Sequence, residues 1–155
     1  MIDNKKCKDF LTLLEQISLD IKWACVTRAD VIDDRILDLC RSAGCVEIHF
    51  GLDSANKKTQ SLINKNLDMD MLEKRCKYAQ SIGIRTKLSI ILGLPDETEE
   101  DIIHTVDMLK EIRPNEIQIY PLMPYVGTDL FDKNKDTGVY LLEKDLSKWR
   151  QDAFQ

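Results

Sequence analysis

The 155-residue sequence lacks the features that mark membrane-spanning, secreted and fibrous proteins. It contains six glycines and four prolines, too few for a collagen-like or low-complexity chain. No apolar run approaches the length of about 18 residues that spans a membrane, and no apolar signal core follows the first residues, Met1–Lys6. With 43% hydrophobic and 32% charged residues, the composition instead predicts a globular cytoplasmic protein without a membrane partner.

The sequence also lacks concentrated positive charge and several common catalytic motifs. Its net charge is −5, and no run of Lys or Arg exceeds two residues, which argues against a nucleic-acid partner. There is no Gly-x-Ser-x-Gly turn, no His-Glu-x-x-His sequence and no glycine-rich phosphate loop. No nucleophile and base are therefore paired by the sequence, and the catalytic residues stay unassigned.

The cysteines form an odd set without the spacing of a metal or cluster site. No Cys-x-x-Cys pair occurs, and the five residues are separated by 17, 14, 4 and 30 others. We interpret them as free, buried thiols of a reducing compartment, with no metal ligand among them. They are Cys7, Cys25, Cys40, Cys45 and Cys76.

Segments with strand character alternate with helical segments along most of the chain. Each predicted helix carries one apolar stripe, and glycines follow two of them at positions typical of a helix end, Gly44 and Gly83. This alternation predicts an α/β fold with a parallel sheet. The predicted strands are Ile21–Thr27, Cys45–Gly51, Ile84–Leu92 and Ile117–Leu122; the predicted helices end at Ile17, span Asp33–Ala43 and Met69–Ile82, and begin at Thr98.

One face of the predicted sheet is polar across its whole width. Apolar residues such as Val46, Ile48 and Phe50 alternate with polar ones along each strand, and Ile117 and Ile119 continue the apolar face. The polar face either lines a wet, ligand-binding lumen or lies in solvent on a two-layer sandwich, and alternation alone does not choose between them. The lumen residues we expect on it are Arg28, Glu47, His49, Arg85 and Lys87.

Five short motifs at the ends of these strands occur in one order. Together they resemble the later part of the radical S-adenosylmethionine (radical SAM) enzyme barrel, in the branch with cobalamin-binding enzymes, methylthiotransferases and coproporphyrinogen dehydrogenase-like proteins. The resemblance implies a partial, TIM-barrel-like β/α barrel over residues 1–131, whose four strands are the third to sixth of six, followed by a loop and helical arm over 132–155. The motifs are Trp23-x-Cys-x-x-Arg28, Phe50-Gly-Leu-Asp-Ser54, Ile63-Asn-Lys65, Ile91-Leu-Gly-Leu-Pro-Asp-Glu-Thr98 and Pro124-Tyr-Val-Gly-Thr128.

The resemblance assigns roles to individual residues around S-adenosylmethionine. Asp53 and Ser89 match positions that contact the ribose hydroxyls, although both side chains are shorter than those common in the family. Lys65 matches a basic residue that pairs with the methionyl carboxylate. Ile91 matches a residue that packs on adenine, while Gly93 and the backbone from Tyr120 match positions near the adenine edge.

The family's four-iron, four-sulfur cluster is held by a Cys-xxx-Cys-xx-Cys sequence, and this chain has none. The resemblance therefore implies that the cluster binds only to a full-length form. We expect the four-stranded segment to be completed by a missing N-terminal barrel segment or by self-association through its strand edges.

Two other functions remain open from the residues. One is a non-catalytic binding or scaffold module with the same barrel shape, which the short Asp53 and Ser89 side chains favour. The other is a small, cluster-independent α/β enzyme that uses Lys87 or His49 on the lumen face. The sequence identifies neither the substrate nor a role for cobalamin.

Overall fold

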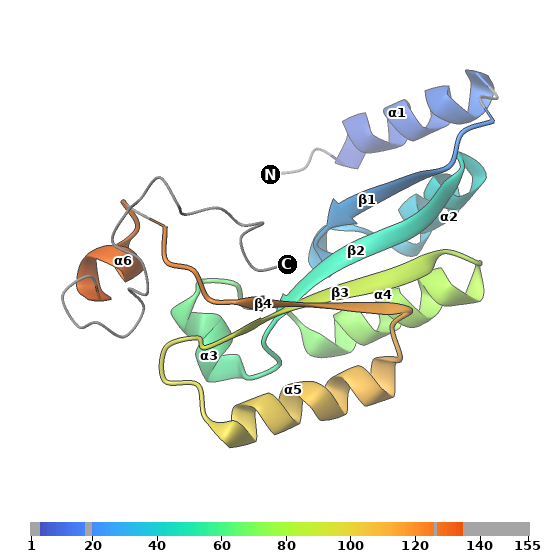
Figure 1. Ribbon diagram of the computed structural model, residues 1–155. Coiled ribbons are helices and arrows are strands. Elements are labelled where there is room, and N and C mark those ends of the chain that lie inside the picture. The colour runs from blue at the N-terminus through green and yellow to red at the C-terminus, as the bar shows by residue number, and fades with distance from the viewer. Residues whose placement is uncertain (1–3, 18–19, 126, 135–155) are drawn as a thin grey trace. The chain divides into compact units, whose positions relative to one another are not determined.

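The computed structural model describes residues 4–17, 20–125 and 127–134, in two compact units that divide after Pro121. The first unit is built on one parallel sheet, in which the four strands are neighbours in their order along the chain (Figure 1). The strands are β1 (Trp23–Thr27), β2 (Cys45–Asp53), β3 (Arg85–Leu92) and β4 (Glu116–Pro121). The predicted class, an α/β partial barrel with about four parallel strands, is confirmed.

Helices connect successive strands and lie against one face of the sheet, as α4 and α5 do in Figure 1. Helix α1 precedes β1 and contacts α2, while the short α3 and the longer α4 together link β2 to β3. The short helices α3 and η1 were not predicted from the sequence. The helices are α1 (Asn4–Ile17), η1 (Ala29–Val31), α2 (Asp34–Ser42), α3 (Lys57–Leu62), α4 (Met69–Ser81) and α5 (Glu99–Ile112).

Local sequence signals set the helix ends. Thr98 and Asp101 form a reciprocal capping box at the start of α5, as the sequence predicts. Gly44 and Gly83 follow α2 and α4 with φ of 93° and 81°. Gly44 is also sterically required, since a Cβ there would lie 2.3 Å from the carbonyl oxygen of Ile21. These caps fix where each helix returns the chain to the sheet.

The predicted alternation is confirmed in the two central strands. Ile48 and Phe50 of β2 and Leu88 of β3 are fully buried under the helices, whereas the residues between them on β2 are half-buried on the opposite face. Val46 departs from this pattern because the pairing of β1 with β2 steps from Cys45 directly to Glu47. This bulge leaves Val46 half-buried and buries Cys45 instead.

Strand β4 differs from the other strands in how its apolar face is covered. Ile117 and Ile119 were expected beneath a helix, but 45% and 57% of their surfaces are exposed. Helix α5 buries Thr105, Leu109 and Ile112, and no further helix lies over β4 in the described part of the first unit. The sheet therefore ends in a strand whose apolar side is open.

The second unit contributes one described helix, α6 (Asp129–Asn134). A loop was expected to begin at Phe131, and this expectation was wrong for residues 131–134, which belong to α6. The rest of the predicted loop and the helical arm, residues 135–155, lie outside the described residues, and the domain boundary at residue 131 stays a prediction. Among the helices described in both units, none is long and apolar enough to cross a membrane.

Candidate functional site

The carboxyl ends of β1 and β2 hold a cluster of charged side chains. The Nζ atom of Lys65 lies 2.5 Å from Oδ2 of Asp53, and these side chains are only 12% and 20% exposed. Asp53 has a left-handed φ of 64°, which an aspartate tolerates better than most residues. The structure thus brings together two residues that the sequence placed at the cofactor, with the ammonium group held beside a carboxylate.

The segment between α3 and α4 positions Lys65. Its neighbours Asn64 and Asn66 both have positive φ, so the chain makes a tight local turn on each side of it. The Lys65 backbone N–H donates to the carbonyl oxygen of Gln60, and the Arg28 guanidinium donates to the Lys65 carbonyl oxygen at 3.1 Å. The Lys65 backbone is therefore fixed from two sides.

Gln60 is a buried amide that ties this segment to the sheet. Its Nε2 donates to the carbonyl oxygens of Ser54 at 2.6 Å and Leu52 at 3.3 Å, and its Oε1 accepts the Leu67 N–H at 2.6 Å. A buried amide satisfied on both sides gives the backbone around it a fixed geometry. Gln60 thus supports Lys65 without lying in the charged cluster itself.

Gly51 leaves the space in which the Lys65 ammonium lies. A Cβ atom at position 51 would stand 2.9 Å from Lys65 Nζ, 3.7 Å from Asp53 Oδ1 and 3.8 Å from Ser89 Oγ. The backbone of Gly51 is not in the left-handed region, so its role is spatial. Because this glycine has no side chain, the groups of Asp53, Lys65 and Ser89 converge over one point of the sheet.

Arg28 and Asp30 border the same cluster. Nε and Nη2 of Arg28 donate to the two carboxylate oxygens of Asp30 at 2.9 and 2.7 Å. This paired hydrogen bond lowers the pKa of Asp30 and raises that of Arg28. The pair holds the guanidinium just beyond the carboxyl end of β1, where it also reaches the Lys65 carbonyl oxygen.

The other predicted cofactor residues lie along β3 and β4. Ser89 is buried and stands opposite Gly51 on one side and Gln118 on the other, while Ile91 pairs with Tyr120. Asp53 and Ile91 also help to line one small cleft. Gly93 has a φ of 84°, and a Cβ atom added to it would meet no atom within 4 Å. Close packing is therefore not what requires a glycine there.

The predicted lumen residues form ion pairs across neighbouring strands. Glu47 Oε2 lies 3.6 Å from Arg85 Nε, and Lys87 Nζ lies 2.5 Å from Glu116 Oε1. Hydrogen bonding lowers the pKa of Glu116 and raises that of Lys87. The polar face of the sheet therefore carries paired charges across β2, β3 and β4.

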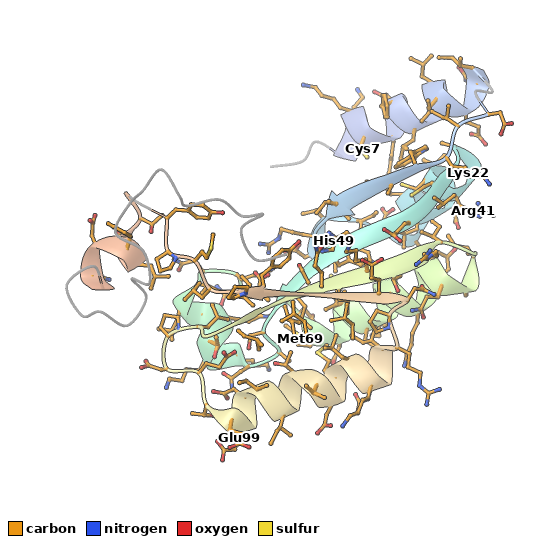
Figure 2. The ribbon with its side chains drawn as sticks, in the orientation of Figure 1. Cys7, Lys22, Arg41, His49, Met69 and Glu99 are labelled. Atoms are coloured by element: carbon orange, nitrogen blue, oxygen red, sulfur yellow. The ribbon has the colours of Figure 1, made fainter. Side chains whose placement is uncertain are left out.

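His49 stands on β2 directly opposite Lys87 of β3 and two residues from Glu47, and it is labelled on the sheet in Figure 2. Burial lowers its pKa first, and the nearby Lys87 charge lowers it further, so the neutral imidazole is favoured near pH 7. Its Nε2 atom is buried and has no hydrogen-bond partner among the described residues. A neutral imidazole with an unused ring nitrogen is equipped to accept or donate a hydrogen bond.

Sequence reasoning missed four residues that shape this site. Gly51 carried a usable signal, because a glycine inside a strand marks a close approach. Asp30 and Glu116 were visible as charges, but the Arg28–Asp30 pair follows from the local backbone after β1 and the Lys87–Glu116 pair from the strand register. Gln60 gave no signal, since a glutamine in a polar helix looks solvent-exposed.

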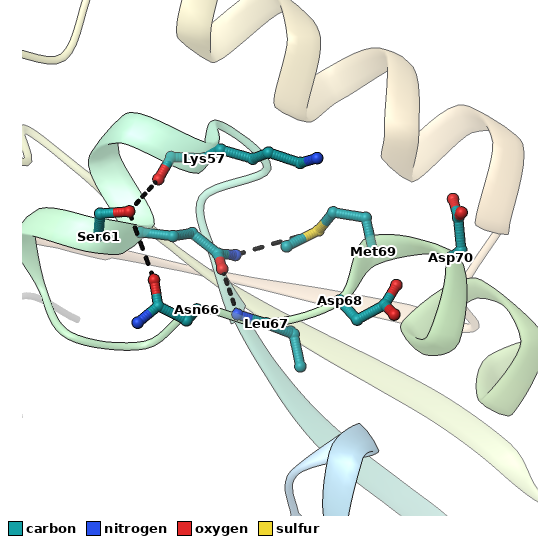
Figure 3. Close-up of a pocket in the computed structure, with 8 residues that line it drawn as sticks. Lys57, Ser61, Asn66, Leu67, Asp68, Met69 and Asp70 are labelled. Carbon is teal, nitrogen blue, oxygen red and sulfur yellow. Dashed lines mark hydrogen bonds between the residues drawn. The ribbon is translucent and has the colours of Figure 1, made fainter.

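A larger hollow lies outside this cluster, between α3 and the start of α4 (Figure 3). Its volume is about 480 Å³, and it contains neither Asp53 nor Lys65. Polar groups in its wall bond to one another: Ser61 Oγ donates to the Lys57 carbonyl oxygen and to Asn66 Oδ1. We therefore assign the candidate site to the sheet and not to this hollow.

The cysteines do not make a metal site. No group of three metal-ligating side chains occurs within residues 4–17, 20–125 and 127–134. Burial raises the pKa of Cys40 and of Cys76 to about 12 each, which disfavours the thiolate that metals bind. The residues described here therefore do not fit an iron–sulfur cluster.

Comparison with curated proteins places the chain among larger relatives. An uncharacterized methyltransferase of Pyrococcus horikoshii is 27% identical over 131 residues, covering 84% of this chain and 28% of the relative. Anaerobic magnesium-protoporphyrin IX monomethyl ester cyclase of Rubrivivax gelatinosus is 27% identical over 137 residues, which cover 87% of this chain and 25% of the cyclase. The chain thus spans about a quarter of the length of both.

Solved structures show the same fold. Coproporphyrinogen III oxidase of Escherichia coli, a radical SAM enzyme, matches 79% of this chain and 29% of its own with a TM-score of 0.69 and 22% identity. A radical S-adenosylmethionine methyltransferase of Kitasatospora setae, solved with cobalamin and a [4Fe-4S] cluster, matches 74% of this chain and 24% of its own, with a TM-score of 0.67 and 18% identity. The family model described as the radical SAM superfamily matches residues 3–109. The chain belongs to the radical SAM superfamily.

Proposed function

We propose that this chain forms part of the S-adenosylmethionine pocket and part of the substrate pocket of a cytoplasmic radical SAM enzyme. The observation that carries the proposal is the Lys65 ammonium group, held against Asp53 over the open backbone of Gly51. In open α/β sheets, ligands bind at the carboxyl ends of parallel strands, where this cluster lies. Membership of the superfamily supports S-adenosylmethionine as the ligand of this cluster.

The chemistry of the cluster suits S-adenosylmethionine. The ammonium of Lys65 complements the methionyl carboxylate, with which it would form a charge-assisted hydrogen bond. Asp53 has a second carboxylate oxygen beyond the one bonded to Lys65, and this Oδ1 can accept from a ribose hydroxyl. Ser89 Oγ converges on the same point and adds a second polar group for the ribose.

The residues described here bind and orient the cofactor but do not hold the iron–sulfur cluster. In the superfamily, the bound cluster supplies the electron that cleaves S-adenosylmethionine. The proposed contribution of this chain is to keep the methionyl and ribose groups at fixed places on the sheet and to present the paired charges of β2–β4 to the substrate. His49 would offer that substrate a hydrogen bond from a neutral imidazole.

Calorimetric titration with two ligands tests the proposal. S-adenosylmethionine carries a carboxylate, whereas 5′-methylthioadenosine retains the ribose and adenine but lacks the amino-acid group. We expect Lys65→Met to weaken binding of S-adenosylmethionine by about 10-fold or more and to leave binding of 5′-methylthioadenosine unchanged. Ser89→Ala should weaken binding of both ligands, because both contain the ribose.

Lys58→Met provides the matched control, since Lys58 is an exposed lysine of the adjacent helix α3. Its affinities should equal those of the native chain. Equal losses for both ligands in Lys65→Met, or no binding of either ligand to the native chain, would contradict the proposed role of this cluster.

A further inference from the structure

Arg28 links the end of strand β1 to the segment that carries Lys65. Its Nη2 atom donates to the Lys65 carbonyl oxygen at 3.1 Å. The same guanidinium donates from Nε and Nη2 to the two carboxylate oxygens of Asp30, at 2.9 and 2.7 Å. One planar group thus bonds two acceptors at once, a carboxylate just after β1 and a backbone carbonyl that lies 37 residues further along the chain.

The turn after β1 sets the place of this guanidinium. The short helix η1 begins directly after Arg28, and its first residue, Ala29, is only 1% exposed. Helix α4 contacts η1, so the turn is packed against the first unit. Asp30 lies in this turn, and its carboxylate holds the guanidinium in one orientation by two parallel hydrogen bonds. The Arg28 side chain, which is 45% exposed, is therefore oriented by its partner and not by burial.

Lys65 needs such a support because its segment is irregular. It lies between α3 and α4, and its neighbours Asn64 and Asn66 have φ of 55° and 45°. The Lys65 N–H donates to the Gln60 carbonyl oxygen, which ties one side of the residue to α3. The Arg28 bond ties the carbonyl side to β1. A lysine stem has several rotatable bonds, so the ammonium stays at one point more readily when the backbone on both sides is held.

The ion pairs of Arg28 and Lys65 also lie near enough for their charges to interact. The hydrogen bond with Asp30 raises the pKa of Arg28 most, and the Asp53 charge raises it further. In turn, the hydrogen bond with Arg28 lowers the pKa of Asp30 most, and the Lys65 charge lowers it as well. Two cations and two anions thus form one cluster. A change at Arg28 is therefore felt at the Lys65 ammonium through the charges as well as through the backbone.

We propose that Arg28 is a positioning residue for S-adenosylmethionine, which holds Lys65 where its ammonium meets the methionyl carboxylate and does not itself touch the ligand. This inference rests on the proposed function and extends the site to the turn after β1. The hydrogen bonds of Arg28 go to Asp30 and to the Lys65 backbone, which is the pattern of a support. An arginine suits the place, since a lysine ammonium has no planar fork with which to bond both carboxylate oxygens and the carbonyl.

An NMR experiment without ligand tests the support itself. Arg28→Lys keeps the positive charge but removes the planar fork, so we expect relaxation of the Lys65 Cε nucleus to show a more mobile side chain. The carbonyl carbon signal of Lys65 should also shift, because this oxygen loses a donor. Arg35→Lys is the matched control, since Arg35 is an exposed arginine of α2, and it should change neither signal. A Lys65 side chain that is as ordered in Arg28→Lys as in the native chain would overturn the proposal.

Calorimetric titration distinguishes positioning from direct contact. Arg28→Lys should weaken binding of S-adenosylmethionine about five-fold and leave binding of 5′-methylthioadenosine, which lacks the carboxylate, unchanged. In the Lys65→Met chain, which has no ammonium to position, Arg28→Lys should cause no further loss. A further loss there would mean that Arg28 contacts the ligand, and equal losses for both ligands would mean a general structural role. Either result overturns the proposal.

The role of Arg28 and the proposed function fail in different ways. If the native chain binds S-adenosylmethionine and Arg28→Lys binds it equally well, only the role of Arg28 is wrong. If the native chain binds neither ligand, the proposed function is wrong, and the order of the Lys65 side chain in Arg28→Lys still decides whether Arg28 supports Lys65.

Discussion

Replacing Gly51 by valine tests whether the Lys65 ammonium group occupies the space next to this glycine. The valine side chain would fill the position where Lys65 Nζ now lies, 2.9 Å from an added Cβ, and would force the ammonium away from Asp53. A hydrogen bond between charged groups contributes about 2 kcal/mol to the free energy of unfolding. Replacing a glycine by a β-branched residue within a strand raises the free energy of unfolding by about 1 kcal/mol. Gly51→Val should therefore destabilise the native chain by about 1 kcal/mol in net.

A double-mutant cycle with Lys65→Ala isolates this effect. Once the lysine side chain is gone, valine has free space, so Gly51→Val should stabilise the Lys65→Ala chain by about 1 kcal/mol. Urea unfolding of the four proteins gives the coupling energy, which we expect to be about 2 kcal/mol. If Gly51→Val changes the free energy of unfolding equally in both backgrounds, Lys65 does not occupy the space above Gly51 and the reasoning fails.

Three further predictions concern the lumen and its support. The pKa of His49 is lower in the folded chain than in the unfolded chain, so the unfolded chain binds more protons and the free energy of unfolding should fall as the pH drops through about 6.5. Urea unfolding at several pH values measures this fall. The variant His49→Gln should remove it, and substitution of the exposed His104 should not. Lys87→Met should raise the pKa of His49 in an NMR titration, and an unchanged value would contradict their coupling. Gln60→Leu leaves buried backbone groups of Ser54 and Leu67 unpaired and should cost about 2 kcal/mol or more, with faster amide exchange around Lys65. A cost below that of a surface substitution would refute the supporting role of Gln60.

The fold was predictable because its signals are local. Capping residues such as Thr98, the glycine after α2 and the period-two alternation around Ile48 act within a few residues, and each appears in the structure as expected. The bulge at Val46 was not predictable, because it depends on how β1 and β2 align. The exposure of Ile117 likewise depends on which element lies over β4, and the sequence of the strand does not contain that information.

For the candidate site, the sequence suggested which residues to group but not how their side chains are arranged. The motifs placed Asp53, Lys65 and Ser89 near one cofactor, and the structure brings their polar groups together over Gly51. The pairing of Arg28 with Asp30 and of Lys87 with Glu116 follows from loop geometry and strand register. The Lys87–Glu116 pair joins residues far apart in the sequence, and the two-residue spacing of Arg28 and Asp30 does not by itself predict a hydrogen-bonded pair, so the folded chain identifies both.

The proposed cofactor site can be mapped by an NMR titration of the isotope-labelled chain with S-adenosylmethionine. We expect the largest chemical-shift changes at the backbone amides of Gly51, Asp53, Lys65 and Ser89, and we expect Lys65→Met to reduce them. Changes centred on the α3–α4 hollow around Ser61 and Asp70, or no changes at saturating ligand, would contradict the assignment of the cofactor site to this face of the sheet.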